Sequence, residues 1–259
     1  MLTNYTEANV QNFPEVSLII ISEKDSEKIF ETLQKVQKYF HEQKMEAEII
    51  LADREKSFGT IHKSFLPIII SFNFGVSCQK SLKSAIESAQ GKYIFITDLD
   101  LSTPISEMER FLRYLQSGEE VVVGSRRMGF SKTSRFFLFS LMDELNHLWA
   151  RALRLTDLTD TQGTFLAYEA GVAKALYSKA VTSDRLLAFE TLFLARKLQF
   201  RMVEIPVSWE GEKNLSRETF SKYLFFPFQL LALKLKFSFD TFLVRKDRAR
   251  LVKKRSISS

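Results

Sequence analysis

Short apolar runs alternate with longer segments of helical periodicity over the first half of the chain, and this alternation restricts the fold more than any other feature. Continuous apolar runs of about four to eight residues are typical of strands buried on both faces. The predicted strands cover Val16–Ile21, Glu48–Ala52, Ile68–Phe72, Tyr93–Thr97 and Val121–Gly124. The predicted helices cover Asp25–Phe40, Ser77–Gln90 and Ser106–Leu115. Such alternation predicts an α/β fold, with a mostly parallel sheet flanked by helices.

The pattern changes after Gly124. A long amphipathic helix is predicted over Ser134–Leu155, a second helix over Asp184–Leu198 and an extended segment over Arg201–Trp209. The apolar stripe of the long helix consists of Leu138, Leu141, Leu145, Leu148 and Ala152. His147 lies away from this stripe, and no histidine has the spacing of a metal ligand, so the histidines are interpreted as structural.

The composition fits one large globular domain, or one domain with an appendage. The chain has 259 residues, of which 45% are hydrophobic, and its single cysteine, Cys78, excludes an intramolecular disulfide. The N-terminus lacks a basic segment followed by an apolar one, and no stretch of about 20 uninterrupted apolar residues occurs. We therefore expect neither a signal peptide nor a spanning helix, and a reducing, cytosol-facing compartment.

Two aspartates, Asp98 and Asp100, directly follow the fourth predicted strand. Ligands of open parallel sheets bind at the carboxyl ends of the strands. In an extended backbone the two carboxylates would lie on one side, about 6–7 Å apart. Such hard oxygen ligands suit Mg²⁺ or Mn²⁺, which could offset the charge of a leaving diphosphate. The alternative interpretation is a turn with a helix N-cap, because a bare D-x-D is common by chance.

The stretch GKYIFITDLDLSTP (residues 91–104) resembles the D-x-D segment of family 2 glycosyltransferases with the GT-A fold. It is most similar to the polyprenyl-phosphate branch, which includes dolichyl-phosphate glucose and mannose synthases. Further blocks follow in that family's order: VVVGSRR (121–127), Arg135 with Ser140, DTQ (160–162) with Phe165, Ala188-Phe189-Glu190 and EIPVSW (204–209). The resemblance extends from about Val16 to Trp209 and implies a GT-A, Rossmann-like fold.

The blocks that bind the donor in this family depart from its pattern. Its Pro-Ala-Tyr-Asn-Glu is replaced by residues 21–25, of which Asp25 could keep a base-binding carboxylate. In its Val-Asp-Asp-Gly-Ser block only the second acid remains, as Asp53. Val76 replaces a cationic or polar phosphate contact, and Leu192 replaces the second acid of Phe-Asp-x-Glu. An altered donor and a chain without turnover both stay open.

The resemblance implies inverting transfer of a sugar from a UDP- or GDP-sugar to the phosphate of a polyprenyl lipid. Asp98 and Asp100 would hold the Mg²⁺ or Mn²⁺ on the donor diphosphate. The remaining site residues comprise two donor-binding carboxylates, Asp25 and Asp53, an acceptor- or sugar-orienting carboxylate, Asp160, and two cations for the acceptor phosphate, Arg126 and Arg135. Asp53 could instead be a turn residue, Asp160 an N-cap and Arg126 a solvated surface residue.

The C-terminal segment carries the basic character of the chain. Residues 216–259 contain 11 Lys and Arg against 3 Asp and Glu, although the whole chain is only +6. An amphipathic helix is predicted over Tyr223–Val244, with one apolar face formed by Phe228, Leu231, Leu235, Phe239 and Phe242. This helix would lie in the bilayer interface, and the basic residues 245–255 would face anionic lipids. The alternative is a helix packed on the body with a basic end.

These patterns predict a glycosyltransferase domain over residues 1–215 and a basic membrane-interface tail over residues 216–259. The protein would be peripheral on the cytosolic face of a membrane. A second hypothesis is a degenerate glycosyltransferase fold that binds lipid or a partner without turnover. Nucleic-acid binding through the basic tail is a third, less favoured hypothesis, so nucleic acid is not an expected partner.

Overall fold

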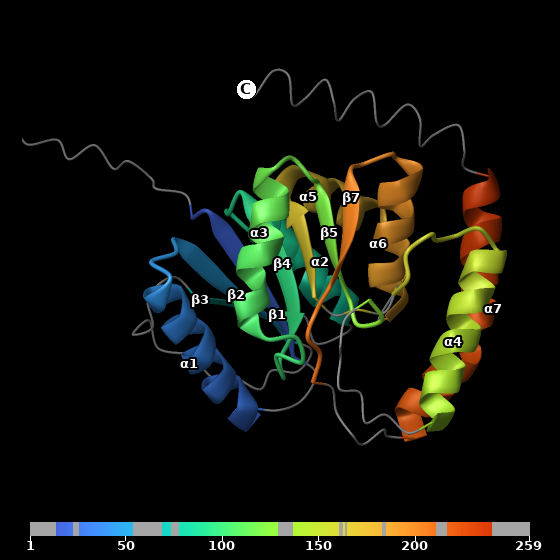
Figure 1. Ribbon diagram of the computed structural model, residues 1–259, viewed down its shortest axis with the longest axis horizontal. Helices are drawn as coiled ribbons and strands as arrows, with labels where there is room; N and C mark the ends of the chain where they lie inside the picture. Colours follow the sequence, from blue (N-terminus) through green and yellow to red (C-terminus); the bar gives the residue numbers. More distant parts are fainter. Residues whose placement is uncertain are drawn as a thin grey trace, which may run out of the picture.

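The described strands form one seven-stranded sheet, which is the middle layer of the molecule (Figure 1). This computed structural model describes residues 14–22, 26–53, 69–73, 78–128, 137–160, 163, 165–182, 185–210 and 217–239. The strands are β1 (Val16–Ser22), β2 (Ala47–Asp53), β3 (Ile69–Asn73), β4 (Tyr93–Asp98), β5 (Val121–Ser125), β6 (Leu166–Glu169) and β7 (Met202–Pro206). Their order across the sheet is β3-β2-β1-β4-β6-β5-β7.

All pairings in the sheet are parallel except the two made by β6. This strand runs antiparallel to β4 on one side and to β5 on the other, so β4 and β5 point the same way. The predicted, mostly parallel α/β sheet is therefore confirmed. The sequence analysis missed β6, because four residues are too few to show a period.

Two layers of helices cover the sheet, which is why its strands can be apolar on both faces. Along β1, Leu18 and Ile20 belong to one core cluster and Ile19 to the other, as expected when side chains alternate between faces. One cluster lies under α1 (Ser26–Glu42) and α3 (Met108–Gln116), the latter preceded by a short 3₁₀ turn, η1 (Ile105–Glu107). The opposite face is covered by α2 (Cys78–Ser88), α5 (Ala170–Lys179) and α6 (Arg185–Lys197).

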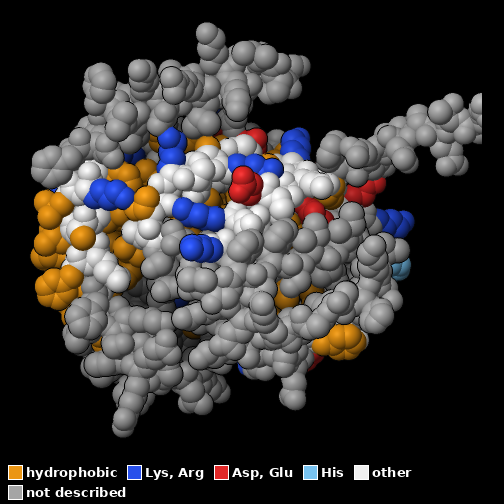
Figure 2. All heavy atoms as spheres, turned by 180° about the vertical axis from the view of Figure 1, so that it is seen from behind, with side chains coloured by type: hydrophobic (Ala, Val, Ile, Leu, Met, Phe, Trp, Pro, Cys, Tyr) orange, Lys and Arg blue, Asp and Glu red, His pale blue; other side chains and the backbone are white. Residues whose placement is uncertain are grey.

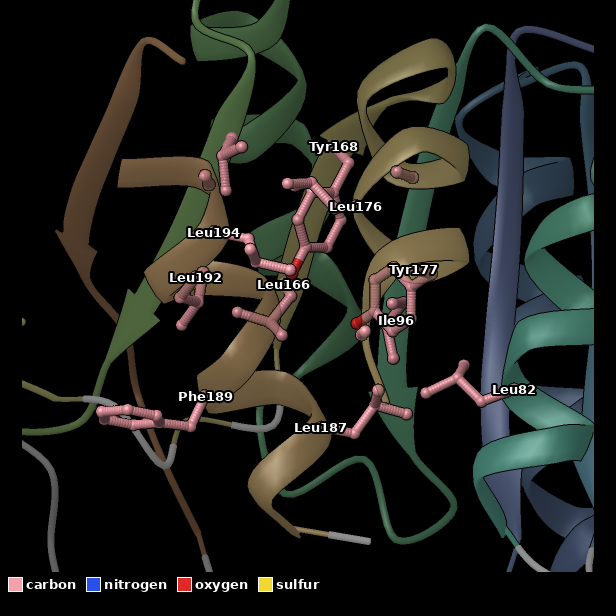
Figure 3. Packing of buried hydrophobic residues seen from close by; sticks show 14 of the residues in the cluster. Leu82, Ile96, Leu166, Tyr168, Leu176, Tyr177, Leu187, Phe189, Leu192 and Leu194 are labelled. Atoms are coloured by element: carbon pink, nitrogen blue, oxygen red, sulfur yellow. The ribbon is translucent and has the colours of Figure 1, made fainter. Parts of the chain in front are cut away.

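The second face has a core rich in large aromatic and aliphatic side chains (Figure 3). Tyr168 of β6 and Tyr177 of α5 meet edge to face, with ring centroids 5.9 Å apart. Burial raises the pKa of both phenols, and that of Tyr177 lies well above its ordinary value. Helix α5, which the sequence analysis did not predict, thus packs against the strand that was also missed.

Helices α4 (Phe137–Ala152) and α7 (Arg217–Phe239) lie side by side beyond α6, at one side of the molecule (Figure 1). Helix α7 packs on α6 through aromatic pairs: Phe189 meets Phe226 at 6.1 Å, and Phe193 meets Phe237 at 5.3 Å between ring centroids. Leu230, on the same side of α7, is fully buried. One side of α7 therefore belongs to the hydrophobic core that it shares with α6.

The apolar stripe predicted for the C-terminal helix faces away from that core. Phe228, Leu231 and Leu235 are exposed, whereas the predicted stripe residue Phe242 lies outside the described residues. The apolar stripe predicted for α4 is also exposed at Leu145 and Leu148. In the described part of the chain, no helix is both long and apolar enough to cross a bilayer.

The edge of the sheet at the amino ends of β1 and β2 is held by a buried carboxylate. Glu48 is 2% exposed, and its Oε1 accepts hydrogen bonds from the Ser17 hydroxyl at 2.5 Å and the Gln90 amide at 2.6 Å. The backbone of Gly91 passes so close to β1 that a Cβ there would lie 2.5 Å from the Ser17 nitrogen. Gly91 therefore permits the close approach of the loop before β4.

Candidate active site

The polar residues singled out in the sequence converge at the carboxyl edge of the sheet. Ser22, at the end of β1, pairs in register with Asp53 of β2, and Ile21 pairs with Asp98 of β4. Because β5 runs parallel to β4, Arg126, which directly follows β5, emerges at the same edge. The order of the strands thus brings together residues that are far apart in the sequence.

The D-x-D segment forms a tight turn at the end of β4. The Asp98 carbonyl accepts the Leu101 amide at 3.2 Å, and its Oδ1 accepts the Ser102 amide at 2.8 Å. Leu101 has a φ of 49°, a left-handed conformation that is uncommon for a residue with a side chain. Asp100 lies within the turn, and Lys28 of α1 donates to its Oδ1 at 3.2 Å.

Leu99 anchors this turn between the two aspartates. Its side chain is 7% exposed, its amide donates to the carbonyl of Ile21 at 3.1 Å, and its carbonyl accepts the Thr32 hydroxyl at 2.8 Å. The side chains of Asp98 and Asp100 are more exposed, in keeping with their places on either side of a buried residue. The turn therefore presents two carboxylates on a backbone fixed by β1 and α1.

Arg126 and Asp160 form a buried ion pair a short way along the same edge. The Arg126 Nε donates to Oδ2 of Asp160 at 2.6 Å, Nη2 donates to Oδ1 at 2.8 Å, and the backbone amide donates to Oδ2 at 3.0 Å. The two side chains are 10% and 2% exposed. A bidentate pair of this kind fixes both groups in position and orientation.

Glu204 and Trp209, which the sequence analysis did not single out as site residues, support this ion pair. The Glu204 carboxylate accepts the amides of Thr159 and Asp160, each at 2.7 Å. The Arg126 guanidinium lies 5.5 Å from the ring centroid of the buried Trp209, within the range of a cation–π contact. Both residues belong to the EIPVSW block, and that block was the available sequence signal.

The segment that follows β7 connects the ion pair to the D-x-D turn. The Val207 amide donates to the carbonyl of Ser125, next to Arg126, at 3.0 Å. Three residues later, the Glu210 amide donates to the carbonyl of Ser102 at 2.8 Å. The turn and the ion pair are thus parts of one hydrogen-bonded edge.

A close approach of two glycines fixes the loop before β6. The Gly124 amide donates to the Phe165 carbonyl at 3.0 Å. A Cβ on Gly163 would overlap the carbonyl oxygen of Gly124. Gly163, which directly follows the DTQ block, therefore lets the loop that carries Asp160 reach β5.

Helix α4 contacts the site through Glu144, which pairs with a second arginine, Arg127. Arg127 pairs with Glu144 at 2.8 Å, and their side chains are 25% and 67% exposed. Next on α4, His147 is buried, and its Nδ1 has no hydrogen-bond partner among the described residues. Burial lowers the pKa of His147, the charge of Arg127 lowers it further, and the carboxylates of Glu144 and Asp160 oppose this shift.

The remaining predicted site residues cannot be placed in the same way. Asp25 and Arg135 lie outside the described residues, and for Asp53 only the backbone at the end of β2 is described. The predicted residues that the structure does bring to one edge are Asp98, Asp100, Arg126 and Asp160. Their individual roles stay predictions.

The donor set at the D-x-D turn suits a cation that takes most of its ligands from a substrate. No group of three or more His, Cys, Asp or Glu side chains able to hold a metal occurs in the described ranges. Mg²⁺ is commonly bound through one or two carboxylates plus substrate phosphates. Asp98 and Asp100 fit that pattern, provided that a bound cation replaces the exposed Lys28 beside Asp100.

The sequence that forms this edge matches a known protein family. The family model described as "Glycosyl transferase family 2" matches residues 17–180, which include the D-x-D turn and Asp160. A curated relative, the glycosyltransferase AglD of Haloferax volcanii, is 28% identical over 131 residues. That match covers 50% of this chain and 21% of AglD, so the chain spans about a fifth of its relative's length.

Two of the solved structures with the same fold are mycobacterial. Glucosyl-3-phosphoglycerate synthase of Mycobacterium tuberculosis, in complex with Mn²⁺, UDP-glucose and phosphoglyceric acid, superposes with a TM-score of 0.61. The match covers 86% of this chain and 79% of the synthase at 13% identity. A crystal structure of a mycobacterial protein matches with a TM-score of 0.59 and 15% identity, over 86% of this chain and 74% of its own. At such identities the likeness establishes the fold alone.

Proposed function

The chain belongs to glycosyl transferase family 2, and on that premise we propose that it transfers a sugar from a nucleotide-sugar to the phosphate of a polyprenyl lipid. The reaction is metal-dependent, inverts the anomeric centre and takes place at the cytosolic face of a membrane. The observation that carries the proposal is the meeting of the D-x-D turn and the Arg126–Asp160 pair at the carboxyl edge of the sheet.

The comparisons support the donor class more directly than the acceptor. The synthase that shares this fold was crystallised with Mn²⁺, UDP-glucose and a phosphate-bearing acid. The lipid acceptor is supported by the motifs between residues 91 and 209, which resemble those of the polyprenyl-phosphate branch and follow in the same order. A phosphate acceptor is already an anion near neutral pH, so the reaction makes little demand on a general base.

Asp98 and Asp100 would hold the divalent cation, which when bound supplies positive charge to offset the leaving diphosphate. The fixed backbone of the turn keeps both carboxylates at the strand end before any ligand arrives. Lys28, now beside Asp100, would be released on metal binding and could then face a donor phosphate. This arrangement contributes positioning and charge stabilisation.

The ion pair changes the role expected of Arg126 and directs attention to its neighbour Arg127, for which the sequence analysis gave no role. Because Nε and Nη2 of Arg126 are engaged by Asp160, we assign Arg126 to positioning that carboxylate, which then orients the acceptor or the sugar. Arg127 pairs with the exposed Glu144, a partner that an incoming phosphate could displace. Arg127 is therefore the better candidate to receive the acceptor phosphate.

A second candidate function is binding without turnover. In the described structure Asp100 pairs with Lys28 and Asp160 with Arg126, and the family's donor-binding blocks are altered in the sequence. A protein of this kind would bind the lipid or a partner but would not transfer sugar. It would still bind vesicles or lipid phosphate, and would show no Mn²⁺-dependent affinity for any nucleotide-sugar.

Calorimetric titration with UDP- and GDP-sugars, with and without Mn²⁺, distinguishes the two functions. We expect one nucleotide class to bind only with Mn²⁺, and the protein to transfer its sugar to polyprenyl phosphate. Asp100→Asn should abolish this binding while hardly changing thermal stability, since the Lys28–Asp100 pair is exposed. Glu109→Gln, which removes another exposed pair, with Arg113, is the matched control. Mn²⁺-dependent binding that survives in Asp100→Asn would contradict the metal assignment.

A further inference from the structure

Exposed large apolar side chains gather on two neighbouring helices. Leu145, Leu148 and Trp149 of α4 are 57%, 63% and 43% exposed. On α7, the exposed fractions are 71% for Phe228, 40% for Leu231 and 54% for Leu235. We call these six residues the α4–α7 surface. The other comparably exposed apolar side chains of the described chain are single residues on separate elements, namely Phe30, Tyr114, Met128 and Val181.

The two helices are fixed to each other, so their apolar residues form one surface. The Trp149 indole N–H donates to the Pro227 carbonyl at 3.2 Å, and the Lys234 ammonium donates to the Leu153 carbonyl at 2.9 Å. Figure 2 shows hydrophobic side chains gathered at its left margin, over α4 and α7, with basic side chains beside them. Contiguous exposed apolar patches of this kind mark sites of interaction.

The fold does not need this surface for its own core. Phe226, Leu230, Leu233 and Phe237 already pack the opposite side of α7 against the body. On α4, Ala150 is fully buried while its neighbours Leu148 and Trp149 are exposed. The outer apolar side chains are therefore left for something outside the described structure.

The charge beside this surface favours a lipid bilayer with anionic lipids as its occupant. Arg151 of α4 and Lys236 of α7 are exposed on the same helices. The sequence after α7 adds seven Lys and Arg against one acid in residues 245–255. Each basic residue near an anionic leaflet contributes about 1 kcal/mol of attraction. Apolar side chains flanked by Trp and long basic side chains are the composition of an interfacial surface.

We propose that the α4–α7 surface lies on an anionic lipid bilayer and delivers the candidate site to its acceptor. Glu144 immediately precedes Leu145 of this surface, and it pairs with Arg127, which is adjacent to Arg126 of the site. A phosphate carried by a membrane lipid would thus reach Arg127 from the side that faces the bilayer. The delivery of the acceptor rests on the proposed function, whereas the membrane contact itself does not.

Vesicle flotation of the full chain tests the contact directly. The vesicles contain phosphatidylcholine and phosphatidylglycerol in a three-to-one ratio, with phosphatidylcholine alone for comparison. We expect binding to both at low salt, stronger to the anionic vesicles, and weakened there by 1 M salt, at which the Debye length falls to about 3 Å. Leu148→Gln with Phe228→Gln and Leu235→Gln should lower partitioning at least about tenfold.

A second triple variant provides the matched control. Phe30→Gln with Tyr114→Gln and Val181→Gln replaces residues that are 53%, 40% and 54% exposed on other elements, and it should bind vesicles like the wild type. Leu145→Gln with Leu148→Gln alone should already weaken binding, because α4 belongs to the surface. All three variants should unfold at the wild-type temperature, since the replaced side chains are exposed.

Three outcomes would overturn the proposal. The first is a wild-type protein that binds neither kind of vesicle at low salt. The second is a surface variant that binds vesicles as well as the control variant does. The third is a wild-type protein that binds no vesicles but forms a concentration-dependent dimer, which the surface variant abolishes. The proposed function fails separately. Vesicle binding without transfer would refute only the enzyme, whereas transfer to a detergent-solubilised polyprenyl phosphate without vesicle binding would refute only the membrane contact.

Discussion

Asp160 accepts three hydrogen bonds from Arg126 while it is almost excluded from solvent, so its charge is needed for more than catalysis. Breaking a buried ion pair by removing one partner costs about 3–5 kcal/mol. We expect Asp160→Asn to lower the free energy of unfolding by about 3 kcal/mol, as measured by urea denaturation. Glu144→Gln, which removes the exposed partner of Arg127, should change it by less than about 1 kcal/mol.

The same variant tests the role of Asp160 in the reaction. At a temperature where Asp160→Asn is fully folded, the transfer rate should fall while the affinity for the nucleotide-sugar stays at the wild-type value. Equal losses in rate and affinity would place Asp160 in the donor pocket. An unfolding free energy that does not change would show that the buried pair contributes little to the fold.

His147 should make stability depend on pH. Because burial and Arg127 lower its pKa in the folded protein, the unfolded chain binds a proton at a higher pH than the folded chain does. Stability is then complete above about pH 6.5, the ordinary histidine value, and is lost as the pH falls toward the lower folded value. His147→Gln should flatten the dependence of the unfolding free energy on pH below about 6.5. An unchanged slope in His147→Gln would contradict this assignment.

At the scale of elements, α7 has two apolar sides: one packs against the core and the other is exposed. Leu230 is fully buried against the body, and truncation of such a residue costs about 2–5 kcal/mol because it removes buried contacts and leaves a cavity. Leu235, which is 54% exposed, offers the same chemistry on the outer side. Leu230→Ala should therefore destabilise the protein by at least about 2 kcal/mol in urea denaturation, and Leu235→Ala by less than about 1 kcal/mol. Equal effects would mean that α7 does not share the core.

At the scale of the whole molecule, binding of a metal and a nucleotide-sugar at the D-x-D turn should raise the melting temperature of the protein. Two carboxylates, one hydrogen-bonded and one paired with Lys28, are a weak site for a cation alone, so Mn²⁺ by itself should hardly change the melting temperature. A bound nucleotide-sugar at about 100 times its Kd adds about 2.7 kcal/mol, which for a protein of this size is roughly 5–10 °C.

Differential scanning fluorimetry measures this linkage. The shift should require both Mn²⁺ and the nucleotide, should vanish on addition of a chelator, and should be missing in Asp100→Asn. An equally large shift with Mn²⁺ alone would point to a complete metal site made by the protein. A shift with nucleotide alone would remove the metal from the proposed function.

The sequence by itself determined the elements with strong local periods and the place of the acidic pair. The apolar runs of β1, β2 and β4 are local patterns, and each predicted strand lies within a residue or two of the observed one. Because parallel strands end at one edge, the position of Asp98 and Asp100 after β4 was enough to predict where they lie. The family blocks contain both Asp160 and Arg126, which the structure joins in one ion pair.

Only the tertiary structure decided the contacts between distant segments. The Arg126–Asp160 pair joins residues 34 positions apart, and no local spacing encodes such a partner. The direction of β6 depends on its two neighbours, because a four-residue strand has no period that distinguishes parallel from antiparallel pairing. Periodicity located apolar residues on α7, but both of its sides are apolar. Which side is buried was settled by the aromatic surface of α6, against which Phe226 and Phe237 pack.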